Sequence, residues 1–66
     1  MKWNLVKVGT EVTWETGDIR GKIVEAFPKE RNCTVELTHD YRSPCGHVHP
    51  RGQQLLIPAM ILRLTN

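Results

Sequence analysis

The 66-residue chain lacks the features that mark membrane proteins and exported proteins. Its apolar runs are short, far below the roughly 18 residues that a membrane-spanning helix needs. The first residues, MKWNLVK, have no apolar core of the kind found in signal peptides. Repeats and low-complexity tracts are absent as well. These absences predict a single small domain that resides in the cytoplasm and does not contact a membrane.

Cysteine is scarce, with Cys33 and Cys45 as the only examples. A pair of cysteines without an export signal is typical of a cytoplasmic protein with free thiols, so a disulfide between them is not expected. Cys33 falls on the apolar face of an alternating segment. This position favours a small core residue over a reactive thiol.

Net charge is low, and the chain is short. Nine Lys and Arg residues stand against seven Asp and Glu residues, which gives a formal charge of +2, weaker than in a dedicated nucleic-acid binder. A chain of this length buries only roughly 60% of the surface that its unfolded form exposes. Domains of this size commonly gain stability from a metal, a disulfide or a partner subunit. We therefore expect a homo-oligomer.

The most informative stretch runs from Val8 to Val24, VGTEVTWETGDIRGKIV. Even-numbered residues from Val8 to Trp14 are apolar or β-branched and alternate with other residues, which predicts a strand with one buried face. Gly17 supplies turn chemistry before a second strand that ends at Pro28. Gly21 lies inside that second strand, where glycine marks a bulge, a bend or a close backbone approach. We expect the second strand to bend there and curl into a closed barrel.

The rest of the chain predicts further strands and one long loop. Residues 33–38 alternate cleanly, residues 55–57 form a short apolar strand that ends at a proline, and residues 62–64 form the last strand. Residues 59–61 fit a single 3-10 turn, and no segment has a 3.6-residue period long enough for an α-helix. The predicted fold is all-β with five strands. Trp14 and Phe27 are expected in its core.

We expect an N-terminal arm or short strand at residues 1–7 and the barrel itself at residues 8–66. Residues 39–53 within it carry no alternation and several prolines and glycines, which predicts a long loop. Loops of this length in a small domain are usually functional or mobile. This loop is therefore the expected working surface.

The order of these elements resembles the SH3-like barrels of the Tudor and KOW type. It is also similar to the plasmid-borne type II dihydrofolate reductases, which are SH3-like barrels assembled as tetramers around one central pore. The matching residues span about three quarters of the chain and are Gly9, Val12, Gly21, Ile23, Val24, Ile57, Pro58, Ala59, Leu62 and Asn66. The resemblance implies a five-stranded SH3-like barrel with a short 3-10 turn before the last strand. The reductases carry Val-Gln-Ile-Tyr before the proline, where residues 54–57 of this chain read Gln-Leu-Leu-Ile, so the resemblance implies the scaffold without the activity.

The predicted loop gathers possible metal ligands, namely His39, Cys45, His47 and His49. Cys45, His47 and His49 follow one another at every second position, which places them on one face of an extended segment. Thiolate and imidazole are ligands that zinc prefers. The spacing lacks the paired C-x-x-C form, and neighbours on one face of a strand start about 6.6 Å apart. A solvated loop is therefore favoured over a metal site, and no cofactor is expected.

Basic and aromatic residues indicate a binding surface. Arg20 and Lys22 project from the outer face of the second strand, while Arg42 and Arg51 flank the loop beside Tyr41. Small barrels bind nucleic acid by combining such charges with aromatic platforms, and exposed aromatic side chains also bind peptides. We expect a non-catalytic module whose partner is nucleic acid or protein. Its predicted contact residues are Arg20, Lys22, Tyr41, Arg42, Arg51 and Trp3.

A catalytic function has little support in the sequence. No third group is placed to orient a Cys45 and His47 pair, and neither a serine elbow nor a phosphate loop is present. No catalytic residue is predicted. The alternative that the resemblance implies is a pore-forming oligomeric reductase related to the type II dihydrofolate reductases, which would bind a pterin and a nicotinamide.

Overall fold

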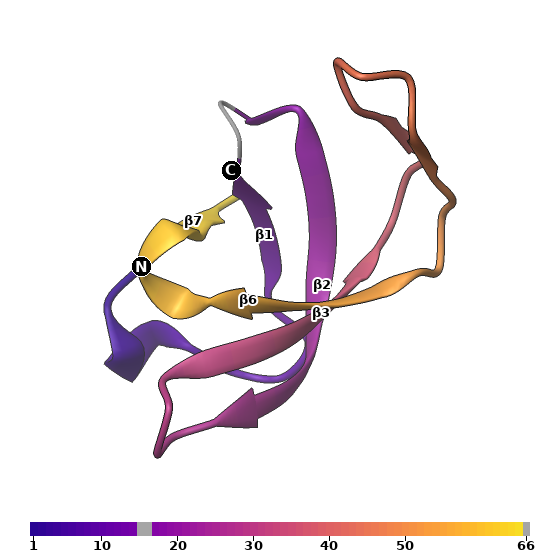
Figure 1. The fold of residues 1–66 in the computed structure, drawn as a ribbon. Helices are drawn as coiled ribbons and strands as arrows, with labels where there is room; N and C mark the ends of the chain where they lie inside the picture. Colours follow the sequence, from indigo (N-terminus) through magenta and orange to yellow (C-terminus); the bar gives the residue numbers. More distant parts are fainter. Residues whose placement is uncertain (15–16, 66) are drawn as a thin grey trace.

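The computed structural model describes residues 1–14 and 17–65 and shows an all-β chain (Figure 1). Its strands are β1 (Glu11–Trp14), β2 (Ile19–Phe27), β3 (Asn32–Leu37), β4 (Tyr41–Arg42), β5 (Val48–His49), β6 (Gln54–Pro58) and β7 (Arg63–Leu64). Short 3-10 helices lie at η1 (Trp3–Leu5) and η3 (Ala59–Ile61). The described residues contain no α-helix, and none of their helices is long and apolar enough to cross a membrane. The all-β class and the 3-10 turn before the last strand are confirmed.

The main sheet is antiparallel and has the strand order β6-β3-β2-β1-β7, while β4 and β5 form a separate two-stranded sheet. The prediction of a closed five-stranded barrel is wrong in two respects. The described part of the chain has seven strands, and within it the edge strands β6 and β7 are not hydrogen-bonded to each other. Pro58 ends β6 without an amide N–H, η3 then turns the chain, and β7 is only two residues long. The sheet therefore curls around its core without closing (Figure 1).

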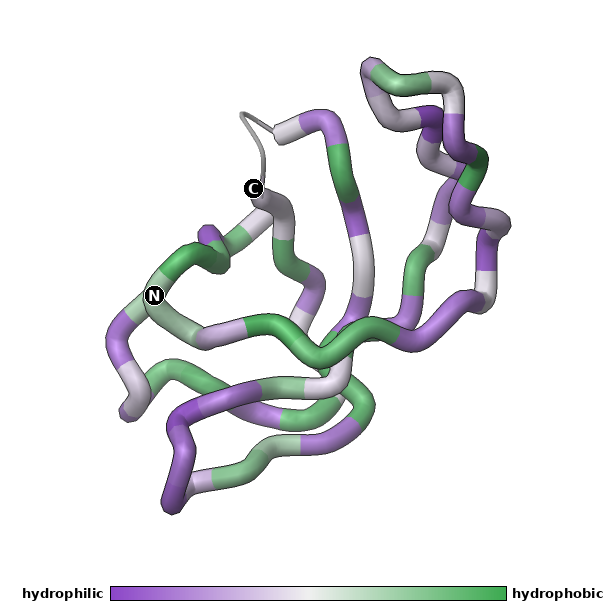
Figure 2. Tube along the Cα trace, viewed as in Figure 1, coloured by the Kyte–Doolittle hydropathy of each residue, from purple (hydrophilic) through white to green (hydrophobic). Residues whose placement is uncertain are grey.

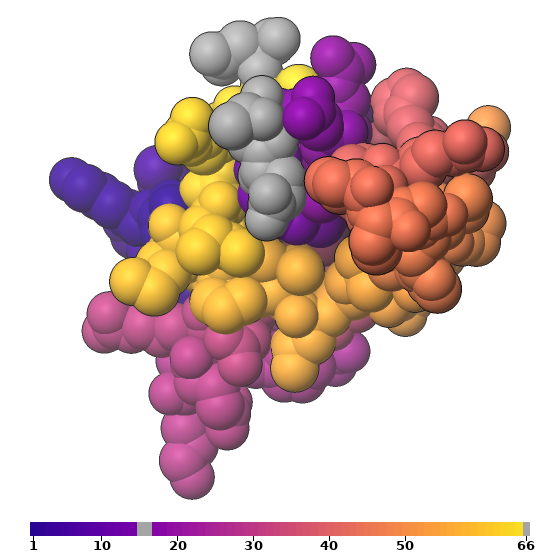
Figure 3. Space-filling view, turned by 45° about the horizontal axis from the view of Figure 1, so that its top comes forward, coloured from indigo at the N-terminus to yellow at the C-terminus, as the bar shows by residue number. Residues whose placement is uncertain are grey.

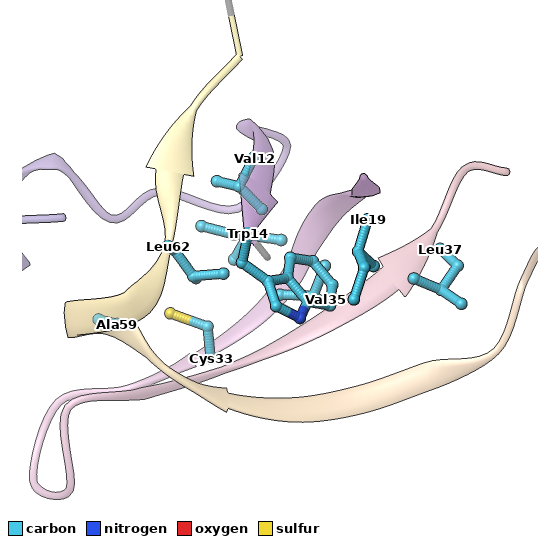
Figure 4. Close-up of a cluster of buried hydrophobic side chains, with 9 residues drawn as sticks. Val12, Trp14, Ile19, Cys33, Val35, Leu37, Ala59 and Leu62 are labelled. Carbon is cyan, nitrogen blue, oxygen red and sulfur yellow. The ribbon is translucent and has the colours of Figure 1, made fainter. Parts of the chain in front are cut away.

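One cluster of buried side chains fills the inside of the curled sheet (Figure 4). It consists of Val12, Trp14, Ile19, Ile23, Cys33, Val35, Leu37, Ala59 and Leu62. Figure 4 shows the Trp14 indole in the middle of this cluster. The predicted inward face of the first strand is confirmed for Val12 and Trp14 but not for Val8, and the predicted core position of Cys33 is confirmed. Residues 15–16, part of the predicted turn, lie outside the described residues, whereas Gly17 has the expected positive φ of 88°.

Gly21 lets two strands approach each other at the centre of the sheet. It is buried between Val12 of β1 and Leu37 of β3. A Cβ added at Gly21 would lie 2.9 Å from the carbonyl oxygen of Glu36 and closer still to the Val35 side chain. The close backbone approach predicted for Gly21 is therefore confirmed.

A β-bulge exchanges the two faces of β2 beyond Gly21. The register between β2 and β3 shifts between Ile23 and Glu25, so Val24 is the extra residue. After the bulge Phe27 pairs with Asn32 on the outer face and is only half-buried. The prediction that Phe27 belongs to the core is wrong because the bulge turns its side chain outward. The switch of faces in β2 therefore lies at Val24, beyond Gly21.

The N-terminal residues pack on one end of the sheet. Residues 3–5 form η1 and not a strand. Trp3 is half-buried and packs against the core together with Met1 and Val6. The N-terminal ammonium group donates a hydrogen bond of 2.8 Å to the carbonyl oxygen of Leu62. These contacts hold the start of the chain against the segment that precedes β7.

Several strand boundaries differ from the predicted ones. The first strand begins at Glu11, because Gly9 takes a φ of 95° and Val8 is 67% exposed. In the turn between β2 and β3 the left-handed residue is Arg31, with a φ of 56°, and not Asn32, which is already the first residue of β3. Figure 2 shows that this turn is strongly hydrophilic, while β6 is hydrophobic through its middle.

Candidate functional site

The segment predicted as a long loop contains a small hairpin. β4 and β5 pair Tyr41 with His49 and Arg42 with Val48. The hairpin projects away from the main sheet, as the orange segment in Figures 1 and 3 shows. An isolated two-stranded hairpin is marginally stable in water, so other contacts have to support one this short.

Three aromatic rings form a row on this hairpin, which we call the ring row (Tyr41, His49 and His47). The rings of Tyr41 and His49 stack with centroids 5.9 Å apart and an interplanar angle of 22°. His47 meets His49 edge to face, with centroids 4.7 Å apart and an angle of 64°. Tyr41 packs against the core, His49 is half-buried and His47 is exposed. The row therefore runs from the protein body out to solvent.

Hydrogen bonds hold the base of the hairpin in place. The Arg51 backbone N–H donates to Oδ1 of Asp40 at 2.7 Å, which joins the two chain segments that enter and leave the hairpin. His49 Nδ1 lies 3.1 Å from Oε1 of Gln53. Because a carbonyl oxygen only accepts, His49 donates through Nδ1–H in this arrangement. The bond fixes the orientation of the ring at the centre of the row.

The hairpin turn places hydrogen-bond partners around the Cys45 thiol. The Ser43 backbone N–H donates to the His47 carbonyl at 2.8 Å, and Gly46 takes a φ of 90°, which closes the turn. The Ser43 hydroxyl lies 3.0 Å from the Cys45 sulfur. This hydrogen bond, followed by one from the His47 backbone, lowers the pKa of the exposed Cys45 thiol. Burial in the core raises the pKa of Cys33 instead.

The possible metal ligands are not brought together. Nowhere in residues 1–14 and 17–65 are three or more His, Cys, Asp or Glu side chains placed to hold a metal ion. His39 Nδ1 and Thr38 Oγ1 share a hydrogen bond of 2.9 Å before the hairpin begins, whereas Cys45 lies in the turn at its tip. Of the four candidates, His47 and His49 contact each other through their rings.

Basic side chains line two hollows at the foot of the hairpin, which we call the basic groove (Arg20, Lys22, Thr38, His39 and Arg51). Lys22 and Arg51 line a hollow of about 330 Å³, and Arg20 and His39 line one of about 120 Å³. Thr38 borders both hollows, so they adjoin. The groove forms because Arg20 and Lys22 occupy outward positions of β2, and β3 leads directly into the hairpin.

Acidic residues offset part of this charge. Glu11 and Glu36 lie opposite Lys22 on the two neighbouring strands, and each also lines one of the hollows. The hairpin itself carries few acidic residues. Asp40 is the only acidic residue in the sequence between residues 39 and 53, and its Oδ1 accepts the bond from the Arg51 backbone. The positive charge is therefore concentrated where the hairpin leaves the sheet.

The predicted contact residues thus fall into two groups. Arg20, Lys22 and Arg51 line the basic groove, and Tyr41 and Arg42 lie on the hairpin that rises from it. Trp3 is not among them. It lines a separate hollow of about 450 Å³, together with Met1, Pro58 and Met60 among others.

Sequence reasoning missed the ring row. It considered His47 and His49 only as possible metal ligands in a solvated loop and did not pair His49 with Tyr41. The available signal was the Pro-Cys-Gly turn at residues 44–46, with aromatic residues on both sides of it. That signal has meaning only once the hairpin is recognised, and strands of two residues leave no alternation to detect.

Comparison of this chain with known protein families, curated proteins and solved structures finds no match. Because a fold alone does not specify a function, the function has to be inferred from the site.

Proposed function

We propose that this protein is a non-catalytic binding module that holds nucleic acid in the basic groove. The observation that carries the proposal is the convergence of Lys22 and Arg51 in one hollow, beside the hollow that Arg20 lines. Cations spaced along one groove can contact successive phosphates of a strand, and such contacts supply most of the affinity in non-specific binding.

The hairpin extends this surface. Arg42 is exposed on β4, next to Tyr41 in the chain, and adds a further cation on the hairpin. The low net charge and the two glutamates near Lys22 limit the attraction. We therefore expect weak to moderate affinity that falls as salt is added, without strong sequence preference.

The test compares matched lysine substitutions. Binding of a fluorescently labelled oligonucleotide is followed by anisotropy over about 50 to 200 mM salt. Lys22→Ala should weaken binding and flatten the salt dependence, because Lys22 lines the groove. Lys29→Ala should change neither, because Lys29 lies in the turn at the other end of β2. The proposal is rejected if the wild-type protein does not bind at low salt, or if both substitutions weaken binding equally.

A second proposal, self-association, has its own supporting observation. Met60 is 81% exposed and Leu56 is 61% exposed. Each lines an apolar hollow, with Trp3 in the first and Phe27 in the second, and both hollows border Glu30 and Asn32. Leu56 also belongs to the edge strand β6, whose one partner strand among the described residues is β3. Apolar surface at a sheet edge favours a protein contact, and we propose a second copy of this chain.

Sedimentation velocity over a range of protein concentrations tests self-association. We expect an oligomer that Leu56→Glu dissociates and that Val48→Glu does not, since Val48 is also exposed but lies on the hairpin. A wild-type monomer at every concentration would exclude the proposal.

We also propose kinship with the SH3-like barrels, in a variant whose sheet is open between β6 and β7. The order of the strands and the position of η3 before β7 support this kinship.

The reductase alternative requires a tetramer with a pore. It is tested by following NADPH oxidation in the presence of dihydrofolate, and we expect no activity. The free thiols of Cys33 and Cys45 support a cytoplasmic location.

A further inference from the structure

The ring row offers more than the hairpin needs for its own stability. Tyr41 and His49 stack as a cross-strand pair, which stabilises a hairpin and accounts for these two rings. His47 has no such role. His47 lies just before β5, and its ring is exposed. Within the described part of the chain, its side chain contacts the ring of His49 edge to face.

The surroundings of His47 match the chemistry of an unpaired nucleobase. An aromatic ring that contacts a neighbouring ring and is open to solvent presents a flat, polarisable surface. Arg51 lines the groove at the foot of the hairpin, whereas Arg42 pairs with Val48 and lies on the face opposite to the rings. Base stacking on an aromatic ring combined with phosphate contacts to nearby cations is how single strands are bound without sequence preference.

We propose that the ring row is a stacking platform for unpaired bases, so that the nucleic acid bound by this protein is single-stranded. This inference rests on the proposed function, since the basic groove has to hold the phosphates. A base would stack on His47, while the backbone of the same strand passes Arg51 and enters the groove. A duplex keeps the faces of its bases inside the helix and cannot make this contact.

The inference also gives a role to the bond between Gln53 and His49. A platform loses affinity if its rings rotate, and this hydrogen bond of 3.1 Å fixes the middle ring. Gln53 is itself held, since its backbone carbonyl accepts from the Leu37 N–H at 2.9 Å at the end of β3. The ring row is therefore joined to the main sheet through defined contacts.

The experiment separates stacking from charge. Anisotropy titrations compare three probes of equal length, namely single-stranded oligothymidylate, an abasic oligonucleotide with the same number of phosphates, and a duplex. The wild-type protein should bind oligothymidylate about fivefold or more tightly than either of the others, because stacking adds affinity for each base. His47→Ala should remove most of this preference and leave binding to the abasic probe unchanged. His47→Trp should increase the preference.

Val48→Ala is the matched control, because Val48 is exposed on the same strand but lies between the two histidines and points away from them. It should leave all three affinities unchanged. A second readout is 2-aminopurine placed in the single strand, whose fluorescence should be quenched on binding to the wild-type protein and less so with His47→Ala. Oligouridylate and its abasic counterpart show whether RNA or DNA binds more tightly. In the strand that binds more tightly, removal of the bases has to weaken binding.

The outcomes are distinguishable. Equal salt-dependent binding of all three probes, or an unchanged preference in His47→Ala, overturns the stacking platform and leaves the basic groove standing. Absence of binding to every probe at low salt overturns both proposals. A preference for the single strand that disappears with His47→Ala supports both.

Discussion

Gly21→Ala is the substitution that most directly tests the arrangement of the sheet. The alanine Cβ would lie 2.9 Å from the carbonyl oxygen of Glu36, and it would meet a methyl group of Val35 at a shorter distance. The backbone carbonyl is fixed by the pairing of β3 with its neighbours, so the strands have to separate. Overpacking of this kind costs about 1 to 3 kcal/mol, and the lower backbone entropy of alanine in the unfolded chain returns only roughly 0.5 to 1 kcal/mol.

Both contacts of the added Cβ are closer than 3.0 Å, so the overpacking cost lies near the upper end of this range, and we expect Gly21→Ala to lower the free energy of unfolding by about 2 kcal/mol. A domain of this length has a total stability of roughly 3 to 10 kcal/mol, so the loss is a large share of it. The corresponding drop in Tm is about 8 to 16 °C. The assay is urea unfolding followed by tryptophan fluorescence, which reports on the buried Trp14 indole.

The double variant with Val35→Ala identifies the cause. Removing the Val35 methyl groups relieves one of the two clashes, so the costs of Gly21→Ala and Val35→Ala should sum to more than the cost of the double variant, by about 0.5 kcal/mol or more. Gly9→Ala is the control, because a Cβ at Gly9 meets no described atom within 4 Å and should combine additively with Val35→Ala. Full stability of Gly21→Ala, or additivity with Val35→Ala, would refute the close approach of β2 and β3.

Three further predictions concern the site and the core. If all the cations of the groove and the hairpin contact phosphates, a plot of the logarithm of the binding constant for single-stranded nucleic acid against the logarithm of the salt concentration should have a slope no steeper than about −3. A slope near zero would contradict phosphate binding. Because its pKa is lowered, Cys45 should react with Ellman's reagent at neutral pH while Cys33 does not. The rate of the Cys45 reaction should fall as the pH falls. Ser43→Ala removes the main cause of the lowered pKa and should slow the reaction at neutral pH. Reaction of both thiols at the same rate in the folded protein would speak against this. In urea unfolding, Phe27→Ala should cost clearly less than Ile23→Ala, for which we expect about 2 to 5 kcal/mol, and equal losses would mean that the bulge does not turn Phe27 outward.

The parts of the fold that the sequence predicts well are those with a regular alternation. In β1 and β3 every second side chain is buried, and the same alternation is visible in the sequence from Val12 to Trp14 and from Cys33 to Leu37. The role of Gly21 is predictable too, because a glycine inside an alternating strand usually marks a bulge or a close backbone approach. These features depend on residues close together in the chain.

The errors arise where distant segments decide the outcome. Ile23 and Val24 are both apolar, so the sequence indicates a change of faces but not the residue at which β3 shifts its register. Closure of the barrel depends on whether β6 reaches β7, which is a property of both edges together. The hairpin is not predictable because its base is held by the bond from the Arg51 backbone to the Asp40 side chain, two residues that lie 11 positions apart and that the fold brings together.

The way in which the hairpin is attached has a consequence for how this protein can change over time. Within the hairpin, Tyr41 is the residue that packs against the core, and the described turn at residues 43–47 contributes no side chain to it. Replacement or lengthening of that turn would therefore leave the folding of the main sheet nearly unaffected. Selection can then alter what the tip recognises generation after generation, while the domain beneath it keeps its stability and its groove.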